Sequence, residues 1–312
     1  MNIQIQSNTI EPGQNAILRL SVGRLPSDTK IYLNVHVFRS TEPGPKVLIM
    51  AGVHGDEINS VEIVRRTLAQ RWFEGLQGGS VVVIPLMNVY GFNNFSREVP
   101  DGKDVNRSFP GSANGSMAAR VAHIFTKHIL PVIDFGVDFH TGGNNNYNYP
   151  QIRYTAGHAR SRELADAFAA PYSISYKPIA KSLRKTALDA GKPILVYEGG
   201  ENLRFDPLAI EHGLAGIQRL LCAQEMLPEA PPPATSSIYL TKTNWIRTDR
   251  SGIFHALKKS GDTIKPGERL AVVNDPYGMD EIPVVAKKAG YIIGHNNNPV
   301  VGMGDALFHI GV

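Results

Sequence analysis

Apolar and polar positions follow two rhythms in the first part of the chain. Near the N-terminus they alternate with a period of two, which is typical of half-buried strands, at residues 1–6, 16–22 and 31–38. From residue 47 the pattern changes to short, wholly apolar runs separated by amphipathic stretches. The apolar runs predict strands at residues 47–50, 80–85, 136–140 and 193–197. The amphipathic stretches predict helices at residues 59–75, 116–130, 161–169 and 207–226.

This alternation predicts an α/β fold. Wholly apolar strands between amphipathic helices imply a sheet whose two faces are both covered. Ligands of such sheets bind just beyond the carboxyl ends of the strands. His54, Glu57, His140 and Glu198 each lie at such an end. Their shared position is stronger evidence for a functional site than any single motif.

A proline-rich stretch divides the chain. Residues 228–237, PEAPPPATSS, predict a stiff, extended linker after a first domain at residues 1–227. Residues 238–312 lose helical periodicity and carry short strand-like runs between turn signals, which predicts a smaller all-β barrel or flattened sandwich. The two halves of this domain resemble each other, because a glycine-led strand followed by a Gly-Asp pair occurs twice, from Gly252 and from Gly290.

Composition excludes several classes of protein. The chain has 32 basic and 28 acidic residues, and its basic residues are scattered, which disfavours nucleic acid and membrane partners but suits small anions. We expect a cytoplasmic protein, since no secretion signal and no apolar stretch of about 20 residues is found. The single cysteine, Cys222, excludes a disulfide framework and a cysteine-rich zinc site.

The sequence AGVHGDE at residues 51–57 carries the main chemical signal. His54 and Glu57 follow a predicted buried strand, where an imidazole and a carboxylate three positions apart can bind one metal ion. His140 ends the later run VDFH and adds a second imidazole. Two histidines and one carboxylate leave one position of a tetrahedral zinc ion open for water, as in catalytic sites. Alternatively, His54 and Asp56 merely cap the helix, or Asp56 orients an imidazole.

Glu198 is the candidate general base and acid. It directly follows the apolar run at residues 193–197 and precedes two glycines, so its carboxylate would be partly desolvated near the metal. There it could take a proton from water and return it to a leaving amine. Glu201 is a nearby competitor, but it does not directly end the strand. The polar and aromatic run at residues 144–149 is either a mobile loop or part of a substrate pocket.

The sequence DGKDVNRSFPG at residues 101–111 places an amide and a guanidinium side by side. Asn106 and Arg107 could hold a substrate carboxylate, because arginine binds carboxylates through two parallel hydrogen bonds. Arg97 could supply positive charge where an oxyanion develops. Asp104 is expected to hold the loop or Arg107 in place. The alternative interpretation is an ordinary charged surface loop.

Together these motifs resemble the succinylglutamate desuccinylase/aspartoacylase family, within the zinc carboxypeptidase superfamily. The resemblance covers about residues 45–225 and implies a zinc-carboxypeptidase-like mixed sheet flanked by helices. The matching segments, in the order of the family, are GVHGDE at 52–57, DVNRSFPG at 104–111, DFH at 138–140 and EGG at 198–200.

The resemblance also implies roles for single residues. It implies one zinc ion per chain, bound by His54, Glu57 and His140, with Glu198 as the general base and acid. It further implies that Asn106 and Arg107 hold the substrate's carboxylate and that Arg97 polarises the scissile carbonyl.

Residues 238–312 resemble the biotinyl/lipoyl-like barrel that is appended in many of these proteins. The lysine that a carrier domain modifies lies on an exposed hairpin between the two halves, and here that place is DPYGMDE at residues 275–281, which contains no lysine. We therefore expect neither biotin nor lipoate. The domain could shield the pocket mouth, mediate subunit contact or stabilise the first domain.

The leading hypothesis is a zinc-dependent hydrolase, a deacylase that cleaves the amide bond of a small N-acyl amino acid or related compound with metal-activated water. A second hypothesis is a carboxypeptidase that acts on short peptides. A third is a non-catalytic protein that binds a metal or a small ligand. For the leading hypothesis we expect a small-molecule substrate bearing a carboxylate and no nucleic acid or membrane partner, with homo-oligomer formation left open.

Overall fold

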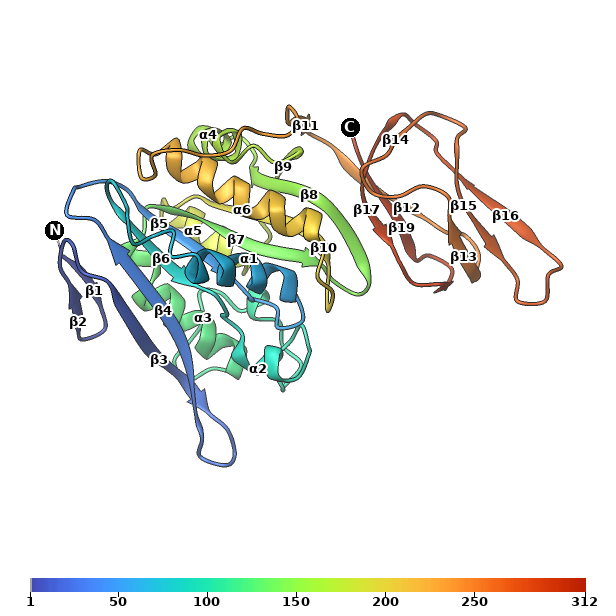
Figure 1. Cartoon of the computed structure of the whole chain (residues 1–312). Helices are drawn as coiled ribbons and strands as arrows, with labels where there is room; N and C mark the ends of the chain where they lie inside the picture. Colours follow the sequence, from blue (N-terminus) through green and yellow to red (C-terminus); the bar gives the residue numbers. More distant parts are fainter. Residues whose placement is uncertain (1) are drawn as a thin grey trace.

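The computed structural model describes residues 2–312, and Met1, the first residue of the alternating stretch 1–6, lies outside them. A helix-flanked sheet makes up the larger part of the molecule, and a smaller group of strands follows at the C-terminal side (Figure 1). In the larger part the strands are β1 (Ile3–Ile5), β2 (Asn8–Ile10), β3 (Ala16–Arg24), β4 (Lys30–Arg39), β5 (Lys46–Ala51), β6 (Ser80–Ile84), β7 (Phe135–Gly142), β8 (Asn146–Thr155), β9 (Tyr172–Tyr176) and β10 (Ile194–Glu201).

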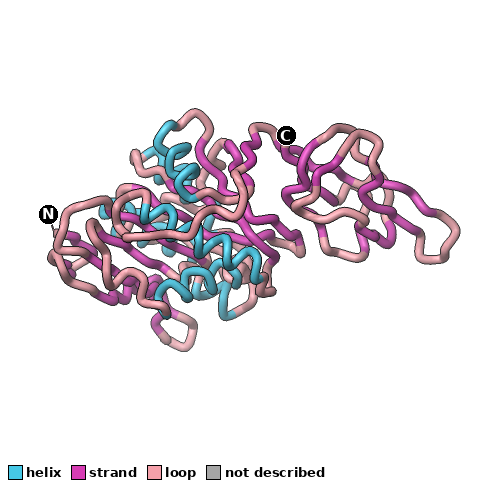
Figure 2. The backbone as a smooth tube through the Cα atoms, turned by 45° about the horizontal axis from the view of Figure 1, so that its top comes forward, coloured by secondary structure: helices cyan, strands magenta, loops and turns pink. Residues whose placement is uncertain are grey.

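Six α-helices accompany these strands within the described residues. They are α1 (Ile58–Ala69), α2 (Val89–Asn93), α3 (Met117–His128), α4 (Ala159–Phe168), α5 (Leu183–Asp189) and α6 (Pro207–Cys222), with short 3-10 turns η1 (Val105–Arg107) and η2 (Leu130–Val132). Figure 2 shows the helices gathered around the strands of this larger part. Within residues 2–312 we find no helix with the length and apolar character that a membrane crossing requires.

The predicted mixed sheet is confirmed. Its strands run in the order β12-β19-β17-β8-β10-β7-β5-β6-β4-β3. The strands β6, β5, β7 and β10 pair in parallel at the centre, and β3 and β4 pair antiparallel at the edge. The central strands are buried along almost their whole length, whereas β3 alternates buried and exposed positions. These two burial patterns match the two rhythms of the sequence.

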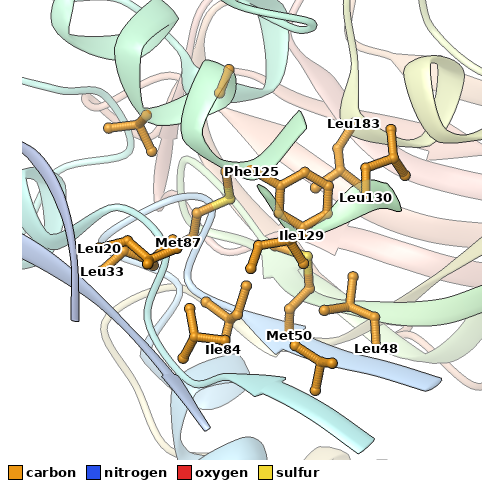
Figure 3. Packing of buried hydrophobic residues seen from close by; sticks show 14 of the residues in the cluster. Leu20, Leu33, Leu48, Met50, Ile84, Met87, Phe125, Ile129, Leu130 and Leu183 are labelled. Carbon is orange, nitrogen blue, oxygen red and sulfur yellow. The ribbon is translucent and has the colours of Figure 1, made fainter. Parts of the chain in front are cut away.

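Two apolar cores lie on opposite faces of the sheet, because successive side chains of a strand point to opposite sides. In β5, Leu48 and Met50 belong to the core that is covered by α3. Figure 3 shows these two side chains in one cluster with Phe125 and Ile129. Val47 and Ile49 join the other core, together with apolar side chains of α1, α4 and α6. The sheet is therefore covered on both faces, as the sequence predicts.

The sequence-based prediction differs from the structure in extent and in number of elements. The first helix ends at Ala69 rather than near residue 75, because Arg71 adopts a left-handed conformation with φ of 58°. Strands β8 and β9 and helix α5 were not predicted. The run at residues 144–149 is not simply a loop, since β8 begins at Asn146.

The C-terminal strands form the predicted small β structure. They are β11 (Ile238–Leu240), β12 (Thr243–Arg247), β13 (Gly252–Ala256), β14 (Thr263–Ile264), β15 (Arg269–Asn274), β16 (Glu281–Val285), β17 (Gly290–Asn296), β18 (Val300–Val301) and β19 (Ala306–Gly311). The repeated halves are cross-paired, because β13 pairs with β18 of the other half and β14 pairs with β17. Residues 228–237, the predicted linker, contain no helix or strand.

The smaller part continues the large sheet. Strand β17 pairs with β8 through residues 146–148, and β11 pairs in parallel with β9. Strand β8 therefore has β10 on one side and both β17 and β9 on the other. Through β8, backbone hydrogen bonds join the two parts of the chain without interruption.

The turn from β5 into α1 crosses the backbone of α2. A Cβ atom placed on Gly55 would lie 2.0 Å from both the carbonyl carbon of Gly91 and the amide nitrogen of Phe92. Only glycine allows this approach, because backbone atoms cannot rotate out of the way. The crossing fixes the position of His54, which immediately precedes Gly55.

We expect Gly55→Ala to lower the free energy of unfolding by about 3 kcal/mol, because overpacking against rigid backbone forces the turn after β5 away from α2. Urea unfolding of the purified variant measures this loss. The matched control is Gly75→Ala, since a Cβ there meets nothing within 4 Å, and its effect should stay within about 0.5 kcal/mol. Equal stability of the two variants would contradict the proposed crossing.

Candidate active site

The carboxyl ends of three adjacent parallel strands bring the predicted residues together. His54 and Glu57 lie in the turn after β5, His140 lies in β7, and Glu198 lies in β10. Glu198 is directly opposite His140 in the pairing of β10 with β7, and β7 also pairs with β5. Residues that are 144 positions apart in the chain (54 to 198) therefore meet at one edge of the sheet.

His54, Glu57 and His140 form a compact buried group. One Glu57 carboxylate oxygen is 2.7 Å from His54 Nδ1, and the other is 2.8 Å from His140 Nδ1. All three side chains are almost fully buried. Their ligand atoms lie within 4.8 Å of one another, so the group could hold a metal ion.

The surroundings of the two imidazoles fit a metal-binding role. Nε2 of His54 is 3.2 Å from Asp104, and Nε2 of His140 is 2.8 Å from Asp138. A carboxylate at Nε2 holds the ring proton there and leaves the Nδ1 lone pair free for a cation. Both Nδ1 atoms face Glu57, so the three donors converge from the side that a cation would occupy.

Electrostatic coupling dominates this buried group. Burial alone would lower the pKa of both histidines, but carboxylates outweigh it, so the pKa of His54 rises beside Glu57 and Asp104, and that of His140 rises beside Asp138 and Glu57. Burial alone would raise the pKa of Glu57, but the two imidazoles outweigh it and lower the pKa. The carboxylate therefore stays ionised in a buried position.

Neither prediction for Asp56 is supported by its contacts. Its side chain accepts a hydrogen bond of 3.0 Å from Asn202, and helix α1 has no side-chain cap. The carboxylate that contacts His54 is Asp104, which lies 50 positions away in the chain. The interpretation of His54 and Asp56 as helix caps is therefore wrong, because tertiary contacts engage both side chains.

Arg97 lies beside the buried group. Its Nη1 is 3.2 Å from His54 Nδ1 and 3.4 Å from a Glu57 oxygen, and its Nη2 donates to Asp104 at 2.8 Å. Asp104 also accepts from the backbone N–H of Asn106, so it holds the loop as predicted. The arginine that contacts Asp104 is Arg97 rather than Arg107.

Asn106 and Arg107 lie together in η1. Asn106 accepts a hydrogen bond of 2.9 Å from the backbone N–H of Leu183, at the start of α5. The exposed side chain of Arg107 donates to the Asn106 carbonyl oxygen at 2.7 Å. The side-chain amide nitrogen of Asn106 and the guanidinium of Arg107 could thus both contact a ligand in the cavity.

Glu198 is held on both carboxylate oxygens. Oε1 is 2.9 Å from Arg153 Nη1, and Oε2 accepts from Asn148 at 2.8 Å. The competitor Glu201 instead accepts a hydrogen bond from Asn297 at 2.7 Å and is not among the residues that line the cavity. Of the two glutamates, only Glu198 lies where it could meet a ligand.

One cavity of about 290 Å³ contains all the predicted site residues. A cavity of this size suits a small molecule. Its lining includes His54, Glu57, Arg97, Asn106, Arg107, His140 and Glu198. Asn146 and Asn148 also line it, which supports the pocket interpretation of the run at residues 144–149. Sequence analysis missed a second set of lining residues, among them Arg153, Tyr176, Arg184, Trp245 and His309.

Within the missed set, Arg153 and Arg184 add positive charge, so that four arginines and three carboxylates line the cavity. Their guanidinium groups lie 5.7 and 5.8 Å from the centre of the Tyr176 ring. Arg184 is only 7% exposed, and its Nη1 has no hydrogen-bond partner within the described part of the chain. Burial, with a smaller contribution from Arg153, lowers the pKa of Arg184 to about 10, which still leaves it charged at neutral pH. The cavity is therefore suited to an anionic ligand.

Two lining residues come from the C-terminal strands. Trp245 of β12 stacks on His309 of β19, with ring centres 4.5 Å apart. Burial, and to a smaller degree the nearby Arg153, lowers the pKa of His309 to about 3, so its imidazole is neutral at physiological pH. The C-terminal part therefore forms one wall of the cavity.

The fold and the site define a class of α/β proteins with a buried His-Glu-His group at the carboxyl edge of a mixed sheet. The sequence profile of the succinylglutamate desuccinylase/aspartoacylase catalytic domain matches residues 43–223. The chain therefore belongs to the succinylglutamate desuccinylase/aspartoacylase family, whose members include deacylases.

Similar proteins agree with this assignment. The N-alpha-acetyl-L-2,4-diaminobutyric acid deacetylase of Halomonas elongata is 28% identical over 281 residues, which cover 85% of this chain and 81% of the relative. Product-bound ectoine utilization protein EutE (DoeB) from Ruegeria pomeroyi has a TM-score of 0.84 at 23% identity. A succinylglutamate desuccinylase/aspartoacylase from Rhodobacter sphaeroides has a TM-score of 0.85 at 24% identity. For each of these two structures, the match covers 96% of this chain and 94% of the other chain.

The low pKa of His309 predicts an acid-sensitive contribution to stability. The pKa is about 3 in the folded protein and near 6.5 when unfolded, so the unfolded chain binds the proton first as the pH falls. Stability is retained above about pH 6.5 and falls below it. Between pH 7 and pH 5, the wild type should lose about 2 kcal/mol more than His309→Phe, which keeps a ring beside Trp245 but cannot titrate.

Urea unfolding at several pH values measures this difference. The matched control is His255→Phe, which replaces an exposed histidine of β13 and should follow the wild-type pH dependence. If His309→Phe also follows the wild-type curve, His309 does not titrate with the assigned shift.

Proposed function

We propose that the chain is a zinc-dependent deacylase that hydrolyses the amide bond of a small N-acyl amino acid. The observation that carries this proposal is one cavity that contains both a group that could hold a metal ion and a further carboxylate, Glu198. The name of the Halomonas elongata relative, a deacetylase of an N-acetylated amino acid, supports the same class of substrate.

The donor set favours zinc. Two imidazoles and one carboxylate are its usual ligands in catalytic sites, and they leave a coordination position open. When bound, zinc would supply Lewis-acid chemistry and lower the pKa of a water molecule toward about 7. We assign the three ligands to His54, Glu57 and His140, with Nδ1 as the histidine donor atom.

Glu198 is the proposed general base and later the general acid. Its two oxygens are each engaged by one donor, which leaves one lone pair on each oxygen for a water proton. It would accept that proton during attack on the amide carbon and deliver it to the leaving amine. Arg97, beside Glu57, would stabilise the negative charge that develops on the carbonyl oxygen.

The substrate carboxylate is assigned to Asn106 and Arg107. An amide N–H and a guanidinium can together hold a carboxylate in one orientation. That grip would direct the amide carbon toward Glu198 and the metal ligands. Nη1 of Arg184, which has no hydrogen-bond partner among residues 2–312, makes the cavity still more favourable for an anion.

A carboxypeptidase that acts on short peptides would use the same residues. The cavity of about 290 Å³ favours a single acylated amino acid over a longer peptide. A non-catalytic binding protein would not need Glu198 in the cavity. Assays with a panel of N-acyl amino acids, their esters and dipeptides distinguish these functions.

Metal removal and a change of the proposed base test the mechanism together. We expect a chelator to abolish hydrolysis of the best panel substrate and one equivalent of Zn²⁺ to restore it. Glu198→Gln should lower kcat by a factor of about 10³ without loss of bound zinc, because the amide cannot accept the proton. The matched control, Glu201→Gln, should keep nearly full activity. Full activity of Glu198→Gln would exclude the assigned base.

Loss of the guanidinium at Arg107 tests the carboxylate grip. Arg107→Met should raise KM for an N-acyl amino acid by a factor of about 10 to 100, since a charge-assisted hydrogen bond contributes about 1.5–3 kcal/mol. Its kcat should change little, and hydrolysis of the corresponding amide without a carboxylate should be unaffected. Steady-state kinetics measure both substrates, with Arg71→Met, at an exposed site, as control. An equal effect on both substrates would contradict the assignment.

A further inference from the structure

Strand β8 holds both oxygens of Glu198, the proposed base. Arg153 Nη1 lies 2.9 Å from Oε1, and Asn148 Nδ2 donates to Oε2 at 2.8 Å. The Glu198 side chain is 12% exposed and that of Arg153 is 21% exposed, so water screens this pair only weakly. Two donors on two oxygens fix the plane of the carboxylate as well as its position.

A register shift makes this arrangement possible. In the antiparallel pairing of β10 with β8, Val196 is opposite Arg153 and Glu198 is opposite Gln151. Side chains of directly paired residues share a face, so Arg153 and Glu198 lie on the same side. Asn148 would lie on the other side of a regular strand, but the register shifts by one residue before Gly200, which is opposite Asn148. The shift therefore brings the amide to the face of Glu198.

The C-terminal part contacts the other end of the Asn148 amide. Gly294 of β17 is paired with Asn148, and a Cβ atom on Gly294 would lie 2.8 Å from Asn148 Oδ1. Asn148 is only 7% exposed, so its amide has little free space. It is enclosed between Glu198 of β10 and the backbone of β17.

A second contact fixes β17 in this position. His295, next to Gly294, accepts a hydrogen bond from the backbone N–H of Ser260 at 3.1 Å, and its ring lies 5.3 Å from that of Tyr147 in β8. The pairing of β17 with β8 is thus supported by the side chain of His295, directly after Gly294.

We propose that Arg153 and Asn148 are positioning residues for Glu198, and that β17 of the C-terminal part, through Gly294, holds the Asn148 amide against the base. This inference rests on the proposed function of Glu198. It gives the C-terminal part a role in the reaction that differs from shielding the cavity, because its backbone sets the orientation of a group in the first part.

The first test separates positioning from binding. Asn148→Ala and Arg153→Met should each lower kcat by a factor of about 10 to 100, as expected when a reacting group is displaced by about 1 Å. The zinc content should stay within about a factor of two of wild type in both variants, and KM should do so in Asn148→Ala, which leaves the charge of the cavity unchanged. Arg153→Lys, which keeps the charge, should recover much of the loss. Wild-type kcat in Asn148→Ala and Arg153→Met would overturn the proposal.

The second test follows the contact from β17. Gly294→Ala should lower kcat by a clearly smaller factor in Asn148→Ala than in the wild-type background, because the added methyl then has no amide to displace and meets only the Tyr147 carbonyl oxygen at 3.2 Å and His309 Cβ at 3.4 Å. The matched control is Gly302→Ala in the same part of the chain, where a Cβ meets no atom closer than 3.7 Å. An equal loss from Gly294→Ala in both backgrounds would exclude transmission through Asn148.

The wild type, Gly294→Ala, Asn148→Ala and the double variant can also be compared by their stability, which needs no activity assay. Urea unfolding should show that Gly294→Ala destabilises the wild type more than it destabilises Asn148→Ala, which tests the contact itself. Failure of this inference is distinct from failure of the proposed function. If Glu198→Gln is inactive while the positioning variants are fully active, only the inference is wrong. If Glu198→Gln is fully active, Glu198 is not the base and both are wrong.

Discussion

The burial of ionisable groups at the end of the central strands is the constraint on which the structure depends. His54, Glu57 and His140 lie where water cannot stabilise their charges, so each charge needs a partner nearby. Asp104 and Asp138 meet the outer nitrogens of the imidazoles, and the imidazoles meet Glu57. Removal of any one partner would leave a buried charge unbalanced. The geometry of the strand ends and of the loop at residues 101–111 is therefore set by charge as well as by packing.

Positive charge is arranged around this group in two layers. Arg97 is paired with carboxylates and completes the buried cluster. Arg153 and Arg184 lie farther along the cavity, beside Tyr176, where Glu198 is the acidic partner of Arg153. The inner layer balances the charge of the His-Glu-His group, whereas the outer layer has positive charge in excess. A ligand with a negative charge would be stabilised in the outer part of the cavity, next to the group that we assign as base.

The site was predictable from the sequence as far as it depends on strand ends. His54, His140 and Glu198 each adjoin an apolar run, so their convergence follows from the parallel sheet. The run at residues 144–149 was predicted as a loop or as part of a pocket, and Asn148 does line the cavity, but its contact with Glu198 depends on a register shift that the sequence does not reveal. Arg153 was not predicted, because β8 contains Pro150 and many polar side chains and does not show an apolar run. One of the two alternatives for Asp56 was that it orients an imidazole, because it lies two positions after His54 in the sequence. The fold brings Asp104 to the His54 imidazole instead. Trp245 and His309 reach the cavity only through packing of the C-terminal part, for which the sequence carries no local signal.

The shared strand β8 has a mechanical consequence. Because β8 is hydrogen-bonded to β10 on one side and to β17 on the other, the two parts of the chain are one continuous sheet and cannot swing apart as hinged lobes can. Opening the cavity by such a swing would require breaking main-chain hydrogen bonds. Any widening of the cavity must therefore come from local changes at its rim, such as rotation of the exposed Arg107 side chain.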